Sequence, residues 1–272
     1  MQLAKVPGTN VQTLFIDSSL LDREVRVDIY IPEFVTDISE TSLLILNDGQ
    51  DLVKMDFGAI LSSLNDQKLI EPLTCIGIHC GPDRKMEYGI AGTPDYKGRG
   101  AQASNYTTFI FEELLPLVRE SYNVSSFREK AFAGFSLGGL MALDIVWNHP
   151  KEFSKAGIFS GSLWWREVDQ SDEKYDDELH RIMHKQIKNG QFSPWQKFFF
   201  ECGTMDETKD RNNNGVIDSI DDTQDLIKDL ISKGFDRNRD IFYLEIEGGR
   251  HDVSTWAKAL PAFLKWGWRK RE

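Results

Sequence analysis

Ala131-Phe132-Ala133-Gly134-Phe135-Ser136-Leu137-Gly138 runs from an apolar, strand-like segment into a G-x-S-x-G pentapeptide. Residues 139–146 continue with apolar side chains at helical spacing. A strand, a sharp turn and a helix in this order lift a serine hydroxyl onto the rim of a sheet, where a base can take its proton. Glycines flank Ser136 because such a turn is strained and tightly packed. The pattern therefore predicts that Ser136 is a nucleophile.

The composition is that of an acidic globular protein. The chain has 272 residues, of which 40% are hydrophobic and 11% aromatic, and its net charge is -11. This length suits one large α/β domain, and no internal repeat or low-complexity linker divides it, so we expect a single domain over residues 1–272. The negative charge repels polyphosphate, which argues against nucleic acid as a partner.

The cysteines and the N-terminus predict the cellular setting. The three cysteines form no C-x-x-C motif and fit a reducing compartment. The N-terminus lacks the apolar core of a signal peptide, and no apolar run approaches the length needed to cross a bilayer. We expect a cytoplasmic protein with no membrane partner, unless a signal has been trimmed. The sequence does not predict an oligomeric state.

Strand and helix patterns alternate along the chain. Residues 11–17 and 23–31 alternate apolar and polar side chains, as an antiparallel edge hairpin does. Short apolar runs predict strands that are buried on both faces, at 43–46, 73–78, 155–160, 198–202 and 241–246. Helical patterns lie between them, at about 52–65, 105–122, 138–149, 221–233 and 252–267. This alternation predicts a three-layer α/β fold with a mostly parallel central sheet and helices on both faces.

Two long segments interrupt this pattern, at about 81–104 and 163–195. The first is rich in glycine, proline and charge, and the second carries a predicted helix around 175–189. Both follow strand ends, where ligands bind in such sheets, so we expect both to overhang the catalytic face. Their side chains either contact substrate or simply pack, and we consider five of them as substrate contacts: Trp164, Trp165, Tyr88, Arg99 and Tyr106.

A serine nucleophile needs a base, and His251 is the best placed of the five histidines. It follows the last predicted strand and a glycine pair, and it opens the C-terminal helix, as the base of an α/β-hydrolase does. His180 and His184 are four residues apart in a charged segment without an H-E-x-x-H pattern. We therefore expect that pair to lie on a solvated helix face rather than to bind a metal.

The third member of a triad accepts the proton on the other imidazole nitrogen and stabilises the imidazolium. Asp206 follows the penultimate predicted strand and is the first choice, with Glu207 and then Asp210 as alternatives. The order Ser136, Asp206, His251 is the order of the α/β-hydrolases. For the oxyanion we expect the backbone N–H of Leu137, at the start of a helix, and that of Gln50 in the Asn47-Asp48-Gly49-Gln50 turn.

These motifs together resemble the putative esterase family. The resemblance rests on the Asn-Asp-Gly-Gln turn, the segments 96–100 and 112–116, the G-x-S-x-G-G elbow, Cys202-Gly203-Thr204-Met205-Asp206, and His251 with Trp256. It spans roughly residues 20–268 and implies an α/β-hydrolase fold and acyl-ester chemistry, with an oxyanion donor at Gln50. The Gly-Thr-Met-Asp step is most similar to feruloyl and enterochelin-esterase-like members, and it differs from the mycolyltransferases, whose acid is a glutamate.

A second motif lies at residues 210–221, four residues after Asp206, and has the pattern of a calcium loop. Oxygen donors fall at positions 1, 3, 5, 9 and 12 and a backbone carbonyl at position 7: Asp210, Asn212, Asn214, Asp218, Asp221 and Val216. The alternative is an Asn/Gly-rich turn that caps the next helix. We expect a bound cation to stiffen the loop that presents the catalytic acid, without a part in the chemistry.

The expected function is hydrolysis of a small-molecule carboxylic ester by a serine esterase through an acyl-enzyme, with no cofactor for catalysis. One alternative is acyl transfer to an alcohol on the same triad. Another is a catalytically idle, calcium-binding scaffold protein. The sequence does not identify the acyl or the alcohol part of the substrate.

Overall fold

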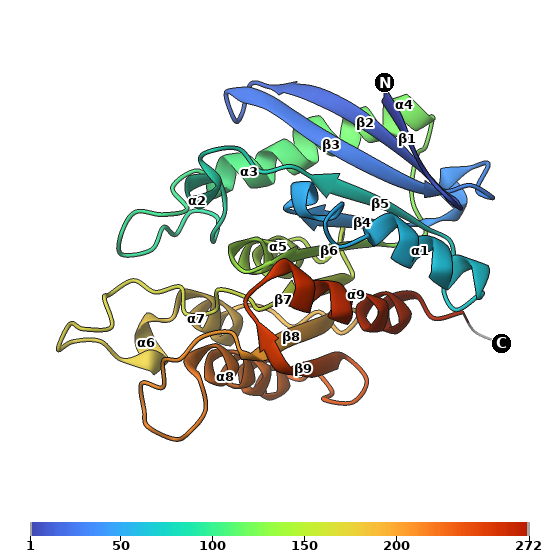
Figure 1. Cartoon of the computed structure of the whole chain (residues 1–272). Helices are drawn as coiled ribbons and strands as arrows, with labels where there is room; N and C mark the ends of the chain where they lie inside the picture. The colour runs from blue at the N-terminus through green and yellow to red at the C-terminus, as the bar shows by residue number, and fades with distance from the viewer. Residues whose placement is uncertain (1, 271–272) are drawn as a thin grey trace.

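The computed structural model describes residues 2–270, and within them one sheet of nine strands crosses the molecule (Figure 1). The strand order is β1-β2-β3-β5-β4-β6-β7-β8-β9. The first three strands pair antiparallel, and β3 joins β5 antiparallel. Every pairing from β5 to β9 is parallel. The prediction of a mostly parallel α/β sheet is therefore confirmed.

The elements follow the predicted alternation closely. The strands are β1 (Gln2–Val6), β2 (Thr9–Ser18), β3 (Arg23–Pro32), β4 (Ser42–Asn47), β5 (Leu73–Ile78), β6 (Lys130–Phe135), β7 (Lys155–Phe159), β8 (Lys197–Met205) and β9 (Ile241–Arg250). The α-helices are α1 (Phe57–Asp66), α2 (Arg84–Glu87), α3 (Ala103–Phe109), α4 (Leu115–Tyr122), α5 (Leu137–Asn148), α6 (Asp177–His180), α7 (Ile182–Asn189), α8 (Asp218–Lys233) and α9 (Val253–Trp268). Short turns are η1 (Ile38–Glu40), η2 (Gly49–Asp51) and the π-helical η3 (Ile110–Leu114), which joins α3 to α4.

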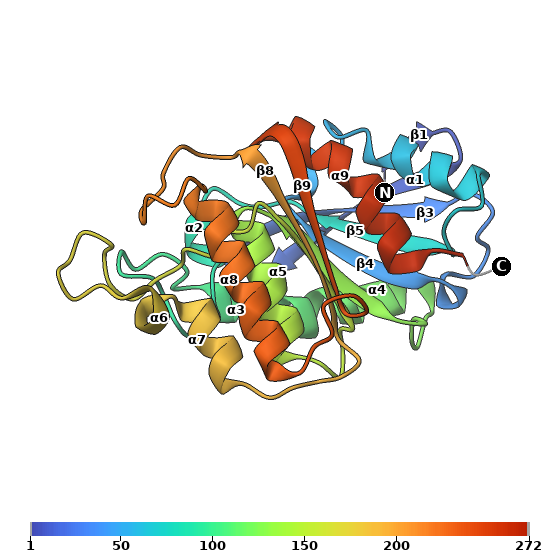
Figure 2. The ribbon, with the colours of Figure 1, turned by 90° about the horizontal axis from the view of Figure 1, so that it is seen from below.

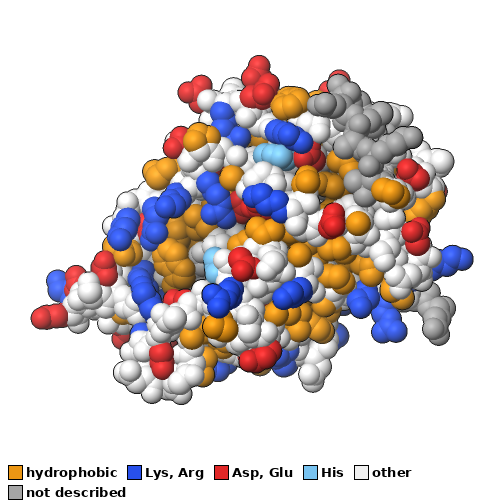
Figure 3. Space-filling view, viewed as in Figure 1, with side chains coloured by type: hydrophobic (Ala, Val, Ile, Leu, Met, Phe, Trp, Pro, Cys, Tyr) orange, Lys and Arg blue, Asp and Glu red, His pale blue; other side chains and the backbone are white. Residues whose placement is uncertain are grey.

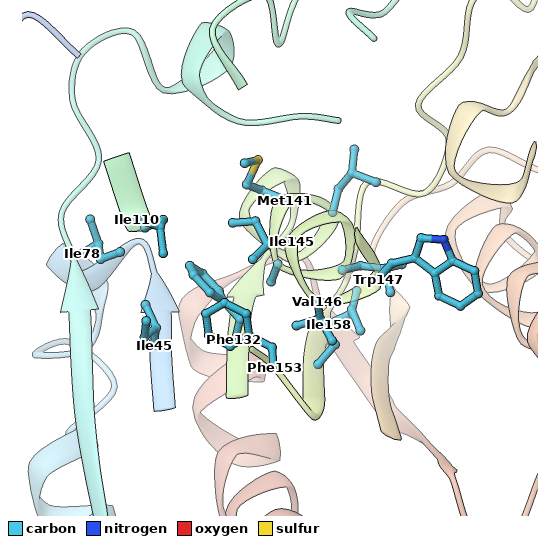
Figure 4. Packing of buried hydrophobic residues seen from close by; sticks show 14 of the residues in the cluster. Ile45, Ile78, Ile110, Phe132, Met141, Ile145, Val146, Trp147, Phe153 and Ile158 are labelled. Atoms are coloured by element: carbon cyan, nitrogen blue, oxygen red, sulfur yellow. The ribbon is translucent and has the colours of Figure 1, made fainter. Parts of the chain in front are cut away.

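Helices cover the sheet on both sides, as Figure 2 shows. One apolar core lies between the sheet and α3, α4, α5, α7 and α8, and the other lies under α1 and α9. In the first core, Ile45, Phe132 and Ile158 from three neighbouring strands lie beside Met141 and Ile145 of α5 (Figure 4). Burying each such side chain stabilises the fold by about 1.5–3 kcal/mol. The helix that begins after Ser136 is thus anchored along its length.

Two predictions about the strands need correction. The hairpin of β2 and β3 is confirmed, but β1 lies outside it and forms that edge of the sheet. The strand predicted at 241–246 was expected to be buried on both faces. Instead β9 is the other edge of the sheet within residues 2–270, and Phe242 is 37% exposed.

The two long insertions extend beyond the carboxyl ends of the parallel strands, on one side of Figure 1. The second contains two short helices rather than one, because the backbone of Arg181 is extended between α6 and α7. The prediction that His180 and His184 share a solvated face is wrong. His184 is fully buried and its Nε2 lies 2.9 Å from the carbonyl oxygen of Asp222, and burial above all lowers its pKa to about 3. Among residues 2–270, no helix has the length and apolar character needed to cross a membrane.

Candidate active site

Ser136 lies at the junction of β6 and α5. Its φ of 55° and ψ of -120° belong to a backbone region that non-glycine residues rarely adopt. The turn is closed by a hydrogen bond from the Ser136 N–H to the Phe159 oxygen (2.8 Å). It is also tight, because a Cβ on Gly134 would lie 2.3 Å from the Gly138 oxygen. Ser136 is half-buried, so its side chain is held by the fold and still reachable from solvent.

The two backbone N–H groups that the sequence predicts as oxyanion donors, those of Leu137 and Gln50, both lie at helix starts. Leu137 is the first residue of α5, where N–H groups have no acceptor within the helix. Gln50 lies in η2. The first hydrogen bond within this turn runs from the Asp51 N–H to the Asp48 oxygen (3.0 Å), so the Gln50 N–H has no acceptor inside the turn. The strands that precede these turns, β4 and β6, are neighbours.

Asn47 and Arg84 hold the Gln50 turn against the serine turn. The Asn47 side-chain amide donates to the Gly138 oxygen (2.9 Å). Arg84 on α2 donates twice to the buried carboxylate of Asp48 (2.6 and 2.7 Å) and once to the Phe135 oxygen (3.2 Å). Sequence reasoning missed Arg84, which lies in an aperiodic, charged insertion and has no local signal.

His251 lies between β9 and α9, and Asp206 lies just beyond the end of β8. Desolvation lowers the pKa of His251, and the negative charge of Asp206 opposes this change. Burial raises the pKa of Asp206, while His251 acts on it in the opposite direction. The pKa of Glu207 is also raised by burial, but the charges acting on it come from Asp218 and other groups, not from His251. Of these two acids, Asp206 is the one electrostatically coupled to the histidine.

Trp256 connects the histidine to the strand ends. Its ring packs edge-on against His251, with centroids 5.3 Å apart, and stacks on Phe135 at 5.2 Å. Its indole N–H donates to Ser160 Oγ (2.9 Å). Phe135 directly precedes Ser136, and Ser160 follows β7. The Trp256 ring thus packs the N-terminal turn of α9 against the strand that leads to Ser136.

The Ser136 hydroxyl has a neighbour that the sequence did not indicate. Its Oγ lies 3.5 Å from Ser162 Oγ, and within residues 2–270 no hydrogen bond joins it to His251. Catalytic hydrogen bonds of this kind often tighten only in the substrate complex. Figure 3 shows that hydrophobic, basic and acidic side chains are interspersed on the face of the molecule seen in Figure 1.

Three of the five side chains considered as substrate contacts are fully buried: Tyr88, Tyr106 and Trp165. Each instead makes a hydrogen bond inside the fold. The Tyr106 hydroxyl donates to Asn47 (2.6 Å), the Asp48 N–H donates to the Tyr88 hydroxyl (3.4 Å), and the Trp165 indole donates to the Thr93 oxygen (3.3 Å). This corrects the expectation of direct contact, because these rings have no surface to offer.

Arg99 and Trp164 remain half-buried at the insertions. The Arg99 guanidinium lies 4.8 Å from the centre of the Trp164 ring and pairs with Asp95. A stacked cation and indole present a planar, partly charged surface.

Within the segment 210–221, residues 212–215 are exposed and the others are half-buried or buried, and α8 begins inside this segment. Asp210 accepts hydrogen bonds from the N–H groups of Asn214 (3.1 Å) and Gly215 (2.9 Å). The side-chain amides of Asn212 and Asn214 both donate to Asp221 (3.0 and 2.9 Å). Four of the predicted ligands are thus joined by short hydrogen bonds.

The predicted ninth-position ligand of this loop has another partner. Asp218 is buried, accepts the Arg211 N–H (2.8 Å) and lies 3.3 Å from the Arg211 guanidinium. At the seventh position, the Val216 N–H donates to Asn214 (2.7 Å). Among residues 2–270, no group of three or more His, Cys, Asp or Glu side chains is arranged to hold a metal ion. Calcium binding therefore stays a prediction, and Asp218 does not fit it as a direct ligand.

The mostly parallel sheet and the serine at its strained turn define an α/β-hydrolase fold. The model of the putative esterase family matches residues 18–266, and the chain belongs to this family. Membership of this family makes it a carboxylic ester hydrolase.

Three relatives illustrate the similarity. The protein YbbA of Bacillus subtilis (strain 168) is 25% identical over 249 residues, which are 89% of this chain and 91% of YbbA. The enterobactin esterase of Shigella flexneri, solved in the presence of enterobactin, is 22% identical with a TM-score of 0.72, and the match covers 94% of this chain and 57% of that one. The siderophore hydrolase EstB of Aspergillus nidulans is 18% identical with a TM-score of 0.68, over 100% and 99% of the two chains.

Proposed function

We propose that this protein is a serine esterase that hydrolyses its substrate through an acyl-enzyme on Ser136. The observation that carries the proposal is the strained turn at Ser136, with φ at 55°, beside two helix starts whose N–H groups point out of their helices. Backbone strain of this kind is kept where it serves a function. A serine nucleophile also needs a base and a group that orients the base. We assign these roles to His251 and Asp206, because the charge of Asp206 acts on the pKa of His251.

In this mechanism the His251 imidazole removes the proton from Ser136 Oγ as the oxygen attacks the ester carbonyl. Asp206 holds the imidazole in the required tautomer and stabilises the imidazolium. The N–H groups of Leu137 and Gln50 stabilise the oxyanion, and His251 then returns the proton to the leaving alcohol. Water, activated by the same histidine, releases the acid and restores the serine.

We propose that the acyl part of the substrate carries a hydroxylated aromatic ring. Structural neighbours include a ferulic acid esterase and an enterobactin esterase solved with 2,3-dihydroxy-N-benzoyl-serine, and both ligand names denote such rings. The stacked Arg99 and Trp164 offer this ring a planar face beside the active-site edge of the sheet.

A panel of esters assayed with the purified protein tests this proposal. We expect hydrolysis of aryl-acyl esters in preference to acetyl esters, with all turnover lost in Ser136→Ala. Product analysis with a competing alcohol distinguishes hydrolysis from acyl transfer. If Ser136→Ala retains wild-type turnover, the proposed mechanism is wrong.

A further inference from the structure

Glu201 is a buried carboxyl group on β8, close behind the proposed catalytic acid. Glu201 is 1% exposed, and within residues 2–270 neither of its carboxyl oxygens has a hydrogen-bond partner. A buried, ionised carboxylate without partners is strongly unfavourable. The residue therefore calls for an explanation that the proposed esterase mechanism does not provide.

The backbone places Glu201 next to Asp206. Alternate residues of a strand share a face, so Glu201 and Gly203 lie on the same face as Phe199, which packs in the core under α9. Asp206 folds back over this face, because a Cβ on Gly203 would lie 2.6 Å from Asp206 Oδ1. The Asp206 carboxylate thus occupies the next position along the strand from the Glu201 side chain. Both of its oxygens are also buried and without a hydrogen-bond partner in the described residues.

One hydroxyl lies close to both carboxyl groups. Ser160 is buried with φ at 44°, its N–H donates to the Glu201 backbone oxygen (2.8 Å), and its Oγ accepts the Trp256 indole N–H (2.9 Å). The Ser160 hydroxyl lowers the pKa of both Glu201 and Asp206, although it makes no hydrogen bond to either carboxyl group within residues 2–270. A single hydroxyl proton cannot satisfy two carboxyl groups at once, so one further donor is missing from this cluster.

A proton on Glu201 would supply that donor. Two adjacent carboxyl groups in a dry site do not both ionise. The titratable groups that act on the pair are His251 and Asp252 at the start of α9, with Arg84 acting on His251 from α2. Burial first, and then the charge of Asp206, raise the pKa of Glu201 to about 8. The charge of His251 lowers the pKa of Asp206, so Asp206 is the member of the pair that ionises.

We propose that Glu201 is a positioning residue whose protonated carboxyl donates a hydrogen bond to the Asp206 carboxylate and so fixes the orientation of Asp206 toward His251. This inference rests on the proposed esterase mechanism. Glu201 takes no part in the bond-making steps. Its loss of a proton at alkaline pH removes the donor and places a second negative charge beside Asp206.

The test compares the wild type with Glu201→Gln, which keeps an N–H donor and cannot ionise. We expect wild-type kcat to fall about tenfold between pH 7 and 10, with a midpoint near pH 8, and the Gln variant to stay level over this range. The same alkaline decline in both proteins, or a decline in neither, would overturn the proposal.

Glu201→Leu separates positioning from packing. We expect kcat at pH 7 to fall about tenfold with KM within twofold of the wild type, while Tm is unchanged or higher because a buried acid has been removed. A wild-type kcat in this variant would overturn the proposal, and if it does not fold, the Gln profile decides. Failure of the proposed function itself would look different, since the wild type would neither hydrolyse esters nor react at Ser136 with a fluorophosphonate.

Discussion

Gly203→Ala is the substitution whose effect can be worked out most fully from the structure. A Cβ at this position would lie 2.5 Å from the backbone of Gly249 and 2.6 Å from Asp206 Oδ1, whereas real Cβ contacts essentially never fall under 3.0 Å. Both the turn before His251 and the Asp206 carboxylate must therefore move, each by about 0.5–1 Å, to reach ordinary contact. Misplacement of about 1 Å can cost about 100-fold in rate. We expect kcat to fall by about that factor.

The stability of this variant should change much less than its activity. Overpacking typically costs about 1–3 kcal/mol, which urea unfolding followed by circular dichroism would measure. Gly267→Ala is the matched control. Gly267 lies in α9, and the nearest atom to its new Cβ would be Lys155 Cδ at 3.8 Å, an ordinary contact distance. The control should keep its kcat and gain about 0.5–1 kcal/mol from better helix propensity. A Gly203→Ala enzyme with full kcat would refute the placement of Asp206.

Three further predictions concern pH, stability and metal. Desolvation lowers the pKa of His251, and the base must be neutral to act. A pH profile of kcat/KM should therefore show activity lost on acidification, with a midpoint below pH 6.5. Arg181→Met should lower the free energy of unfolding in urea by about 3 kcal/mol, because it removes a positive charge that pairs with the buried Asp222. The control Lys185→Met breaks an exposed pair with Glu167 and should lower it by under about 1 kcal/mol. If the 210–221 loop binds calcium, added Ca²⁺ should raise Tm in differential scanning fluorimetry and Asp210→Ala should abolish the rise; no shift in the wild type would count against it.

The parts of the fold that the sequence predicted are those with a local signal. The apolar strand, the glycine turn and the helix around Ser136 lie within one short stretch, and the strand–helix alternation needs only neighbouring residues. The role proposed for His251 rests on its place after the last strand. For each of these, tertiary packing agrees with the local pattern.

The rest depends on contacts between distant segments. Arg84 reaches Asp48 across 36 residues, and nothing in its aperiodic surroundings indicates that pair. His184 lies in a charged segment, yet α8 buries it. Glu201 had a signal that could have been used, namely one acid inside the apolar run 198–202. A charge in a buried strand has to be paired or neutral, and this marks it for closer attention.

Reaction of the wild-type protein with a fluorophosphonate, followed by mass spectrometry of its peptides, tests the central claim most directly. If Ser136 is activated by His251, one adduct should form, on Ser136, and His251→Ala should slow its formation by several orders of magnitude while leaving the protein folded. An enzyme that hydrolyses esters and yet carries no adduct on Ser136, or that labels equally fast without His251, would contradict the account.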